Sequence, residues 1–323
     1  MKRIFITGGT GFIGKHMLRK LCGQGEYSLV ALTRQKRDSK KNLVYLQGDI
    51  SDTSLINHGI EQSDYVVHMA GCKNDPRFFY QVNVKGTQNI IDACEKNCSL
   101  KRLIYLSSVG VIGNSANIVI DEKTTCQPGN AYEKTKLQAE LIVKKYSQQN
   151  PQKVITLRPT NVFGEDDPEK HLLNLFTKIK NNRFCFVGRD RSQFYLNYLY
   201  VKEISELIFS LLSVDVASDI YIINTPVKLN DFIAAIKEKI ADDRPIMHLP
   251  YWPVKMLVSV LDWAAKLTNC SMPINSAKLV ELTNRKIYSA SLLQNDMGWK
   301  PAFNIKDAIS NVTDHYRKQG LLS

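Results

Sequence analysis

A glycine-rich segment near the N-terminus, TGGTGFIG at residues 7–14, constrains the fold more than any other part of the sequence. It follows a run of β-forming residues and precedes an amphipathic run, so it joins a strand to a helix. Gly8 permits the tight turn that leaves the strand, and Gly11 lets backbone approach a pyrophosphate without a Cβ in the way. Gly14 lets the helix pack closely on the sheet, and the N–H groups that begin the helix attract phosphate. The segment predicts a dinucleotide site; an ordinary strand–turn–helix corner is the alternative.

The first half of the chain alternates short β-rich runs with longer amphipathic runs. Helices are predicted at Phe79–Glu95 and Tyr132–Ser147, and Asp219–Asn224 adds a further strand. Such alternation indicates an α/β fold, a Rossmann doubly wound parallel sheet with helices on both faces. We therefore predict an NAD(P)-binding domain at residues 1–165, to which residues 195–225 return. The first six predicted strands are Arg3–Thr7, Ser28–Thr33, Leu43–Gln47, Tyr65–Met69, Leu103–Ser107 and Val154–Arg158.

Beyond residue 165 the alternation weakens, and residues 166–323 are predicted to form a smaller, mostly helical substrate-binding part. The segment Pro253–Thr268 is apolar but carries Lys255, Asp262 and Lys266. Contact with a membrane surface is one interpretation of that segment, and a core-facing amphipathic helix is the preferred one. The predicted helices here are Lys170–Lys180, Leu229–Ile240, Val254–Leu267 and Ile305–Lys318.

Composition excludes several classes of protein. The 323 residues are 44% hydrophobic and 23% charged, which is typical of a soluble globular protein. No segment has the apolar length of a membrane span, and the strand-like start is no secretion signal, so we expect a cytoplasmic protein without membrane contact. The formal charge of +12 is spread along the chain without interleaved aromatic residues, which argues against nucleic-acid binding and suits anionic small molecules. Seven scattered cysteines without a CxxC pair indicate reduced thiols and no metal site.

The end of the second predicted strand bears on the choice of cofactor. NAD enzymes commonly place a carboxylate there to bind the ribose 2′-hydroxyl. This chain instead has Thr33 and Arg34, with Lys36 and Arg37 close by. Because a guanidinium suits a 2′-phosphate, NADP(H) is favoured and NAD(H) is the alternative. Arg34 as a solvated loop residue is the competing interpretation.

Further cofactor contacts are predicted at the ends of the third and fourth strands. Asp49 is placed to accept from the adenine amino group, or else to cap a helix, and Ile50 is placed to pack on the ring. The small residues Ala70 and Gly71 end the fourth strand, where a cofactor would cross the sheet edge. His68 is interpreted as a packed strand histidine.

The chemistry is predicted at YEKTK, where a helix places Tyr132 and Lys136 on one face. A phenol titrates near pH 10, but a nearby ammonium together with a cationic nicotinamide ring favours the phenolate. Tyr132 can then exchange a proton with a substrate oxygen while a hydride moves. Ser107 and Ser108 follow the fifth strand, where a hydroxyl would orient the same oxygen. Without the other motifs, two serines there would suit a helix or turn cap.

Together these motifs resemble the extended short-chain dehydrogenase/reductase family, in its nucleotide-sugar epimerase/dehydratase/reductase branch. The resemblance implies that Ser108 is the catalytic serine and that Tyr132 and Lys136 are the catalytic pair. The segments that carry it are TGGTGFIG, GDISD, VVHMAG, NVKGTQNIIDAC, LSSVGVIG, YEKTK, RPTNVFG, NYLYVKEIS and YSASLLQNDMGWKPAFNIKDAI. The cofactor contacts implied in addition to those above are Phe12, Ile13, Ser107, Tyr132, Lys136 and Pro159.

The resemblance also implies substrate contacts and a homodimer. Besides Ser108, Asn161 faces the substrate or nicotinamide, and Arg285 contacts a diphosphate. Arg189 and Arg191 are weaker diphosphate candidates that suit a solvated surface equally. The homodimer would form through the two helices predicted at Phe79–Glu95 and Tyr132–Ser147.

Departures from the family pattern narrow the activity. Ile112 replaces the tyrosine that usually lines the substrate pocket, and Val109 follows the serines where some relatives have a catalytic cysteine or an acid. We therefore expect an NADPH-dependent sugar-nucleotide 4-ketoreductase, in which Lys136 binds the nicotinamide ribose and lowers the pKa of Tyr132. The alternatives are a 4-epimerase with tightly bound NAD, a reductase of sterol-like or flavonoid-like ketones, and a non-catalytic dinucleotide sensor.

Overall fold

The computed structural model describes residues 1–188, 194–268, 276, 279 and 285–322. The chain forms two compact units. Unit 1 comprises Met1–Val162, Leu199–Thr225 and Tyr288–Ala302, and unit 2 comprises Phe163–Tyr198, Pro226–Ile287 and Phe303–Ser323. Residues 288–302 thus belong with the N-terminal part, whereas the sequence analysis assigned them to the C-terminal part. The reason is local packing, because Leu293 in this segment is fully buried in the core of unit 1.

Unit 1 is built on a seven-stranded sheet with the order β12-β7-β5-β4-β1-β2-β3. All six pairings are parallel. The sheet confirms the predicted doubly wound α/β fold and brings the carboxyl ends of the strands to one edge. The strands are β1 (Lys2–Thr7), β2 (Tyr27–Thr33), β3 (Leu43–Gln47), β4 (Tyr65–His68), β5 (Arg102–Leu106), β7 (Val154–Pro159) and β12 (Ile220–Ile223).

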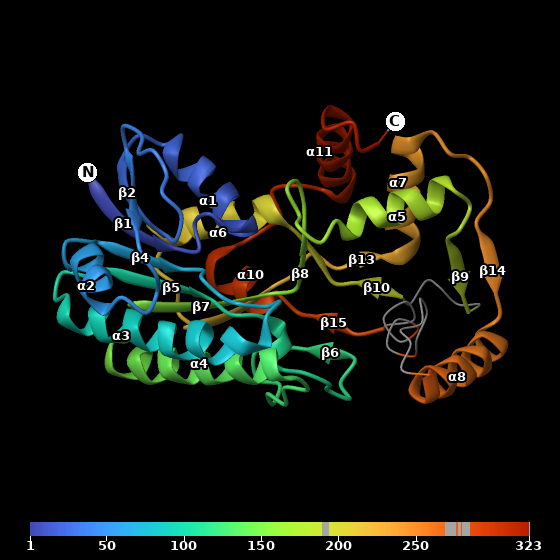
Figure 1. Ribbon diagram of the computed structural model, residues 1–323, viewed down its shortest axis with the longest axis horizontal. Coiled ribbons are helices and arrows are strands. Elements are labelled where there is room, and N and C mark those ends of the chain that lie inside the picture. Colours follow the sequence, from blue (N-terminus) through green and yellow to red (C-terminus); the bar gives the residue numbers. More distant parts are fainter. Residues whose placement is uncertain (189–193, 269–275, 277–278, 280–284, 323) are drawn as a thin grey trace. The chain divides into compact units, whose positions relative to one another are not determined.

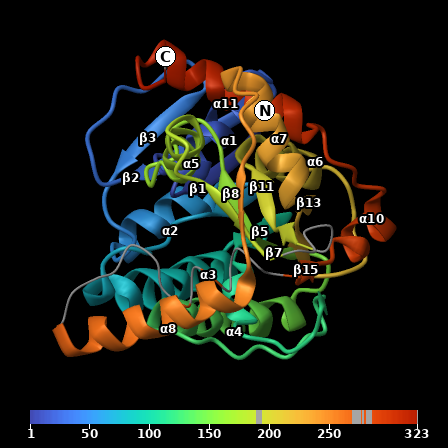
Figure 2. The ribbon, with the colours of Figure 1, turned by 90° about the vertical axis from the view of Figure 1, so that its right-hand side faces the viewer.

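Helices cover both faces of this sheet (Figures 1 and 2). One face packs against α1 (Phe12–Cys22), α6 (Val201–Leu211) and α10 (Ser291–Met297), and the other against α2 (Thr53–Glu61), α3 (Gly86–Lys96) and α4 (Ala131–Gln149). The central strands are mostly apolar because helices bury both faces of the sheet, whereas β1 begins with exposed Lys2 and the edge strand β3 is only partly buried. Short elements complete the unit or lie at its boundaries: β6 (Val119–Ile120), β8 (Asn161–Phe163), β11 (Tyr198–Tyr200) and β15 (Ile287–Tyr288).

The helix predicted at Phe79–Glu95 differs from a regular α-helix in its first half. A 3₁₀ turn at Pro76–Phe78 and a π turn at Tyr80–Lys85 precede α3. Buried Asn83 lies in the π turn, and its side chain bonds both backbone groups of Cys72 and the hydroxyl of Thr135. The wider turn thereby turns an amide side chain inward, a local change that the apolar periodicity does not reveal.

Within its described residues, unit 2 contains four longer helices and two small strand pairs. The helices are α5 (His171–Lys180), α7 (Leu229–Ile240), α8 (Tyr251–Thr268) and α11 (Ile305–Lys318). β9 (Cys185–Val187) pairs in parallel with β14 (Met247–Leu249), and β10 (Tyr195–Leu196) pairs antiparallel with β13 (Val227–Lys228). No helix in the described ranges has both the length and the apolar character to cross a membrane.

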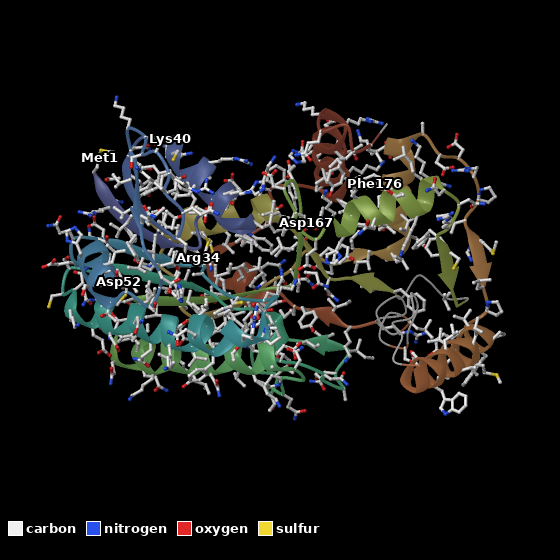
Figure 3. The ribbon with its side chains drawn as sticks, viewed as in Figure 1. Met1, Arg34, Lys40, Asp52, Asp167 and Phe176 are labelled. Atoms are coloured by element: carbon white, nitrogen blue, oxygen red, sulfur yellow. The ribbon has the colours of Figure 1, made fainter. Side chains whose placement is uncertain are left out.

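The core of unit 2 is aromatic. Phe176, labelled in Figure 3, packs edge-on against Tyr316 with 6.3 Å between ring centroids. Phe232 is fully buried beside Phe163. The segment Pro253–Thr268 was expected to be a core-facing amphipathic helix; Val258 on the inner face of α8 is buried, but the outer face exposes large apolar side chains such as Met256 at 71%.

Candidate active site

The glycine loop between β1 and α1 has the shape that a dinucleotide site requires. Gly8 has φ +72°, and a Cβ there would lie 2.6 Å from the amide nitrogen of Ala70, so both the turn and the close approach require glycine. A Cβ on Gly14 would lie 2.1 Å from the Gly8 carbonyl oxygen, which places the start of α1 against the loop itself. Gly11 is the exposed N-cap of α1, and a Cβ there would have only the Gly8 oxygen near it. Phe12 and Ile13 follow as partly buried residues in the first turn.

The loops after β2 and β3 hold the predicted ribose and adenine contacts. Thr33 is buried, and its hydroxyl bonds both backbone groups of Gln35. Arg34, labelled in Figure 3, is exposed, and in the described part of the chain no acid pairs with it. Asp49 is exposed and accepts from the amide and hydroxyl of Ser51, which leaves its second oxygen for a ligand. The Ile50 side chain points into the core, because a Cβ on Gly86 would lie 2.9 Å from it.

A buried polar network fixes the end of β4 beside the glycine loop. His68 is 1% exposed, and its Nδ1 lies 2.6 Å from the hydroxyl oxygen of Thr7, which also accepts from the amide of Ala70. The Nε2 atom of His68 lies 3.0 Å from the hydroxyl oxygen of Thr87. Burial lowers the pKa of His68 to about 3, so the ring is neutral at physiological pH. His68 is therefore the packed strand histidine that was predicted, and Gly71 follows it as an exposed residue.

The two serines after β5 face different surroundings. The Ser107 hydroxyl donates to buried Glu140 at 2.7 Å, so its side chain is engaged inside the unit rather than offered to a ligand. Ser108 caps the short 3₁₀ turn Val109–Val111, where its oxygen accepts from the amide of Gly110 at 3.1 Å. That acceptor role leaves the Ser108 hydroxyl hydrogen able to donate. A Cβ on Gly110 would lie 3.3 Å from this oxygen and 3.1 Å from Glu133 of α4, so the turn rests on the first turn of that helix.

α4 carries the predicted proton donor and its lysine. Asn130 caps the N-terminus of the helix by accepting from the amide of Glu133, so Tyr132 lies in the first turn. The Tyr132 ring packs edge-on against Phe79, with centroids 5.8 Å apart. One turn later Lys136 is 4% exposed, and its Nζ donates to the Leu106 carbonyl at 2.8 Å. Burial lowers the pKa of Lys136 to about 8.

The expected coupling between Lys136 and Tyr132 is not found. Burial, followed by the carboxylate of Glu133, raises the pKa of Tyr132 to about 12. The Lys136 ammonium instead donates to the hydroxyl of Tyr105 at 2.9 Å and lies 4.5 Å from the centroid of that ring. Among the described groups, the Lys136 ammonium is therefore bound to β5. It does not lower the pKa of Tyr132.

Three further residues support the site and were missed in the sequence. Glu140 forms a buried ion pair with Arg158 of β7, whose Nε donates to it at 3.2 Å. Tyr105 of β5 supports Lys136. The spacing contained a signal for Glu140, because Tyr132, Lys136 and Glu140 recur every four residues and so share one helix face. Tyr105 had no such signal within an apolar strand.

The predicted substrate residues are distributed over both units. In unit 1, Pro159 is buried at the end of β7, and Asn161 is exposed at the start of β8. In unit 2, Arg285 is exposed, with its guanidinium 5.7 Å from the centroid of the Phe194 ring. Arg189 and Arg191 lie outside the described residues.

Metal-binding side chains do not gather in the described ranges. No group of three or more His, Cys, Asp or Glu residues there is arranged to hold a metal ion. The six described cysteines are free, and burial raises the pKa of Cys94 far above its usual range. The seventh, Cys270, lies outside the described residues.

The arrangement of glycine loop, serine turn and Tyr132–Lys136 helix has a match among protein families. A family model for the NAD dependent epimerase/dehydratase family matches residues 4–223. The chain belongs to this family. It is an enzyme, not a non-catalytic sensor, and its relatives include nucleotide-sugar 4,6-dehydratases and a 4-epimerase of a sugar carried on polyprenyl diphosphate.

Individual relatives are similar over most of the chain. An Escherichia coli O157:H7 protein, N-acetyl-alpha-D-glucosaminyl-diphospho-ditrans,octacis-undecaprenol 4-epimerase, is 29% identical over 287 residues, which cover 85% of this chain and 84% of that protein. The dTDP-D-glucose 4,6-dehydratase of Mus musculus is 27% identical and covers 98% and 89%. The fold matches the Bordetella bronchiseptica enzyme WbmH in complex with NAD⁺ with a TM-score of 0.73 at 21% identity, covering 99% and 100%.

The residues of the loop fit the family's dinucleotide. Gly8, Gly11 and Gly14 leave no side chain between the loop and the first turn of α1, and the N–H groups that begin a helix favour an anion. Arg34 and Asp49 lie at the ends of the two strands that follow. The loop would hold the pyrophosphate, and the ends of β2 and β3 would hold the adenosine.

Proposed function

We propose that this enzyme inverts carbon 4 of a sugar carried on a diphosphate, as an NAD-dependent 4-epimerase. The observation that carries the proposal is the arrangement of Tyr132 and Lys136 on one face of α4, beside the Ser108 turn at the end of β5. The 4-epimerase relative, similar over 85% of the chain, supports this choice. That relative acts on a sugar attached through a diphosphate to undecaprenol, so the carrier here is either a nucleoside or a polyprenol.

The side chains have distinct roles in the proposed reaction. Held at the glycine loop of Gly8, Gly11 and Gly14, the dinucleotide would supply the hydride acceptor and donor for the chemistry at carbon 4. Tyr132 accepts the proton of the 4-hydroxyl and gives it back to the same oxygen when the hydride returns. Ser108 donates a hydrogen bond to that oxygen and orients it. Lys136, held by Tyr105 and Leu106, supplies positive charge near the cofactor ribose.

Replacing Tyr132 by Phe tests the proposed proton transfer. We expect Tyr132→Phe to lower turnover by about 10²–10⁴-fold while dinucleotide affinity changes less than about twofold, because the ring stays and only the acid–base group is lost. Turnover is measured by NMR of the carbon-4 configuration with a panel of UDP-sugars and polyprenyl-diphosphate sugars. Affinity is measured by calorimetry. Tyr146→Phe, a buried tyrosine on the same helix, is the control. A Tyr132→Phe enzyme with nearly full turnover contradicts the assignment.

A second candidate, an NADPH-dependent 4-ketoreductase, is favoured by Arg34. Its exposed guanidinium at the end of β2 suits a 2′-phosphate better than a 2′-hydroxyl. If this candidate is correct, the purified protein carries no nucleotide and prefers NADPH. Arg34→Ala should then lower NADPH affinity about tenfold or more and leave NADH affinity unchanged. Exposed Lys41→Ala is the control. Stoichiometric NAD released on denaturation supports the epimerase and rejects the reductase.

A further inference from the structure

α8 presents a stripe of large apolar side chains to solvent. Its exposed fractions are 70% for Trp252, 71% for Met256, 60% for Leu257, 61% for Val260 and 66% for Trp263. At 3.6 residues per turn, these five positions fall within an arc of about 140°. We refer to these five residues as the outer stripe. Exposed apolar residues are ordinary when scattered singly, but a contiguous stripe marks an interaction surface.

The opposite face of α8 already holds the helix to unit 2. Val258 is 2% exposed and packs with Val187 and Leu279, and Tyr251 and Val254 pack against the same cluster. The helix is therefore apolar on two sides. Because the inner face provides the attachment, the outer stripe is not needed for folding, and its composition requires another reason.

A lysine lies at one edge of the outer stripe. Lys255 lies at one edge, with its Nζ 5.2 Å from the centroid of the Trp252 ring. The acidic residue of the helix, Asp262, accepts from the amide of Ser276 at 3.1 Å, so its charge is directed toward the chain itself. The whole chain carries a formal charge of +12.

We propose that the outer stripe docks on the surface of an anionic phospholipid bilayer. Tryptophan combines an apolar ring with an N–H donor and is favoured at the level of the headgroups, and lysine beside it attracts anionic lipid. α8 would lie in the plane of the interface, in agreement with the absence of a membrane-spanning helix from the described residues. Two copies of a chain of charge +12 repel one another, whereas anionic headgroups attract it, so charge favours the bilayer over a second copy.

This docking stands apart from the catalytic proposal. It uses residues of unit 2 only, and needs neither a cofactor nor a sugar substrate. An enzyme held in this way would meet a polyprenol-carried sugar diphosphate at the membrane surface. A nucleotide sugar would reach the same enzyme from solution.

The intrinsic fluorescence of the unaltered protein provides the first test. Of its three tryptophans, Trp252 and Trp263 belong to the outer stripe, and Trp299 is 8% exposed in unit 1. Mixed vesicles of phosphatidylcholine and phosphatidylglycerol should shift the emission to the blue and protect it from acrylamide, and the protein should float with them in a density gradient. Absence of both effects overturns the proposal. Pure phosphatidylcholine vesicles should bind the protein less tightly.

Substitutions on α8 then locate the contact. Trp252→Ser combined with Trp263→Ser should lower vesicle affinity about a hundredfold, because about tenfold is expected for each buried ring. Val44→Ser combined with Leu141→Ser is the control, since both side chains are about half exposed in unit 1. Lys255→Gln should lower affinity about fivefold, and Lys145→Gln on α4 should not.

Two further outcomes separate this proposal from its competitors. Equal loss of binding in the α8 and control pairs overturns the docking site. A wild-type dimer in sedimentation velocity that the double tryptophan variant converts to a monomer assigns the outer stripe to a second copy instead. Tyr132→Phe should bind vesicles as the wild type does, so failure of the catalytic proposal leaves this result unchanged.

Discussion

At the scale of single residues, the site contains a buried lysine, Lys136, although burial disfavours a charged side chain. Lys136 is 4% exposed, and two oxygen acceptors on β5 hold its ammonium. YEKTK predicted that lysine and its tyrosine because both lie on one helix face. The partner Tyr105 could not be predicted, because a hydroxyl on a buried strand has no periodic signature. The opposite shifts in pKa of Tyr132 and Lys136 likewise arise from burial by residues distant in the sequence.

The lowered pKa of Lys136 gives a testable pH dependence of stability. Between pH 8 and 10.5 the unfolded chain holds a proton on Lys136 that the folded chain has lost, so this residue makes stability rise with pH. Relative to Lys136→Met, the wild type should gain up to about 1.4 kcal/mol of unfolding free energy per pH unit in that window, and nothing below about pH 7. Urea unfolding from pH 7 to pH 10 measures the difference.

Exposed Lys145 on the same helix provides the comparison for this experiment. Lys145→Met should parallel the wild type across the whole range. A constant difference between the wild type and Lys136→Met would mean that Lys136 is solvated in the folded protein.

At the scale of elements, apolar alternation predicted the seven strands of the sheet within one or two residues at each end. It missed α2, which has only nine residues and a short apolar face, and it overlooked α6, in which Val201, Ile204, Ile208 and Leu211 recur at helical spacing. It also took the π turn at Tyr80–Lys85 for regular helix. There the conformation coincides with hydrogen bonds of buried Asn83 to residues 11 and 52 positions away, which no local pattern encodes.

The close contact of α1 with the glycine loop predicts the effect of one added methyl group. Gly14→Ala should lower dinucleotide affinity more than about tenfold and stability by about 1–3 kcal/mol, because the new Cβ would lie 2.1 Å from a backbone oxygen and must displace the loop. Gly23→Ala at the other end of α1 is the matched control. Its Cβ would lie 3.5 Å from the nearest atom, so a change within about 0.5 kcal/mol is expected. Calorimetric titration measures the dinucleotide affinity of both variants, and urea unfolding measures their stability. A Gly14→Ala protein with wild-type dinucleotide affinity would contradict the placement of the pyrophosphate at this loop.

At the scale of the whole molecule, unit 1 is assembled from three separate stretches of chain. The return of residues near 195–225 was predicted from the strand at Asp219–Asn224, and the structure places 199–225 in unit 1. The return of 288–302 was not predicted, because one short helix with a single fully buried leucine is a weak signal. The substrate role assigned to the remainder stays a prediction.

This assembly predicts that the N-terminal stretch does not fold alone. A fragment ending at Val162 lacks β12 and α6, which bury Leu207, Ile208 and Leu211 in the core. Each fully buried side chain of this kind contributes about 1.5–3 kcal/mol. We expect the fragment to lack a near-ultraviolet circular dichroism signal and a cooperative melting transition. Adding residues 199–225 and 288–302 through flexible linkers should restore both. A fragment that melts as cooperatively as the full chain would contradict this.

The network around His68 has a definite direction. The Thr87 hydroxyl donates to the Asn83 carbonyl at 2.6 Å, so its oxygen must accept from the histidine, which fixes the proton on Nε2. The bare Nδ1 then accepts from the Thr7 hydroxyl. Each hydrogen in this series of hydrogen bonds, from Thr7 through His68 and Thr87 to the Asn83 carbonyl, therefore has a single acceptor.

The same directionality extends toward the proposed reaction. An ammonium can only donate, so the Tyr105 hydroxyl accepts from Lys136 and keeps its own hydrogen for another acceptor. Among the described residues no hydrogen bond joins the Tyr132 hydroxyl to this network, so a proton that Tyr132 exchanges passes to substrate or solvent rather than through Lys136.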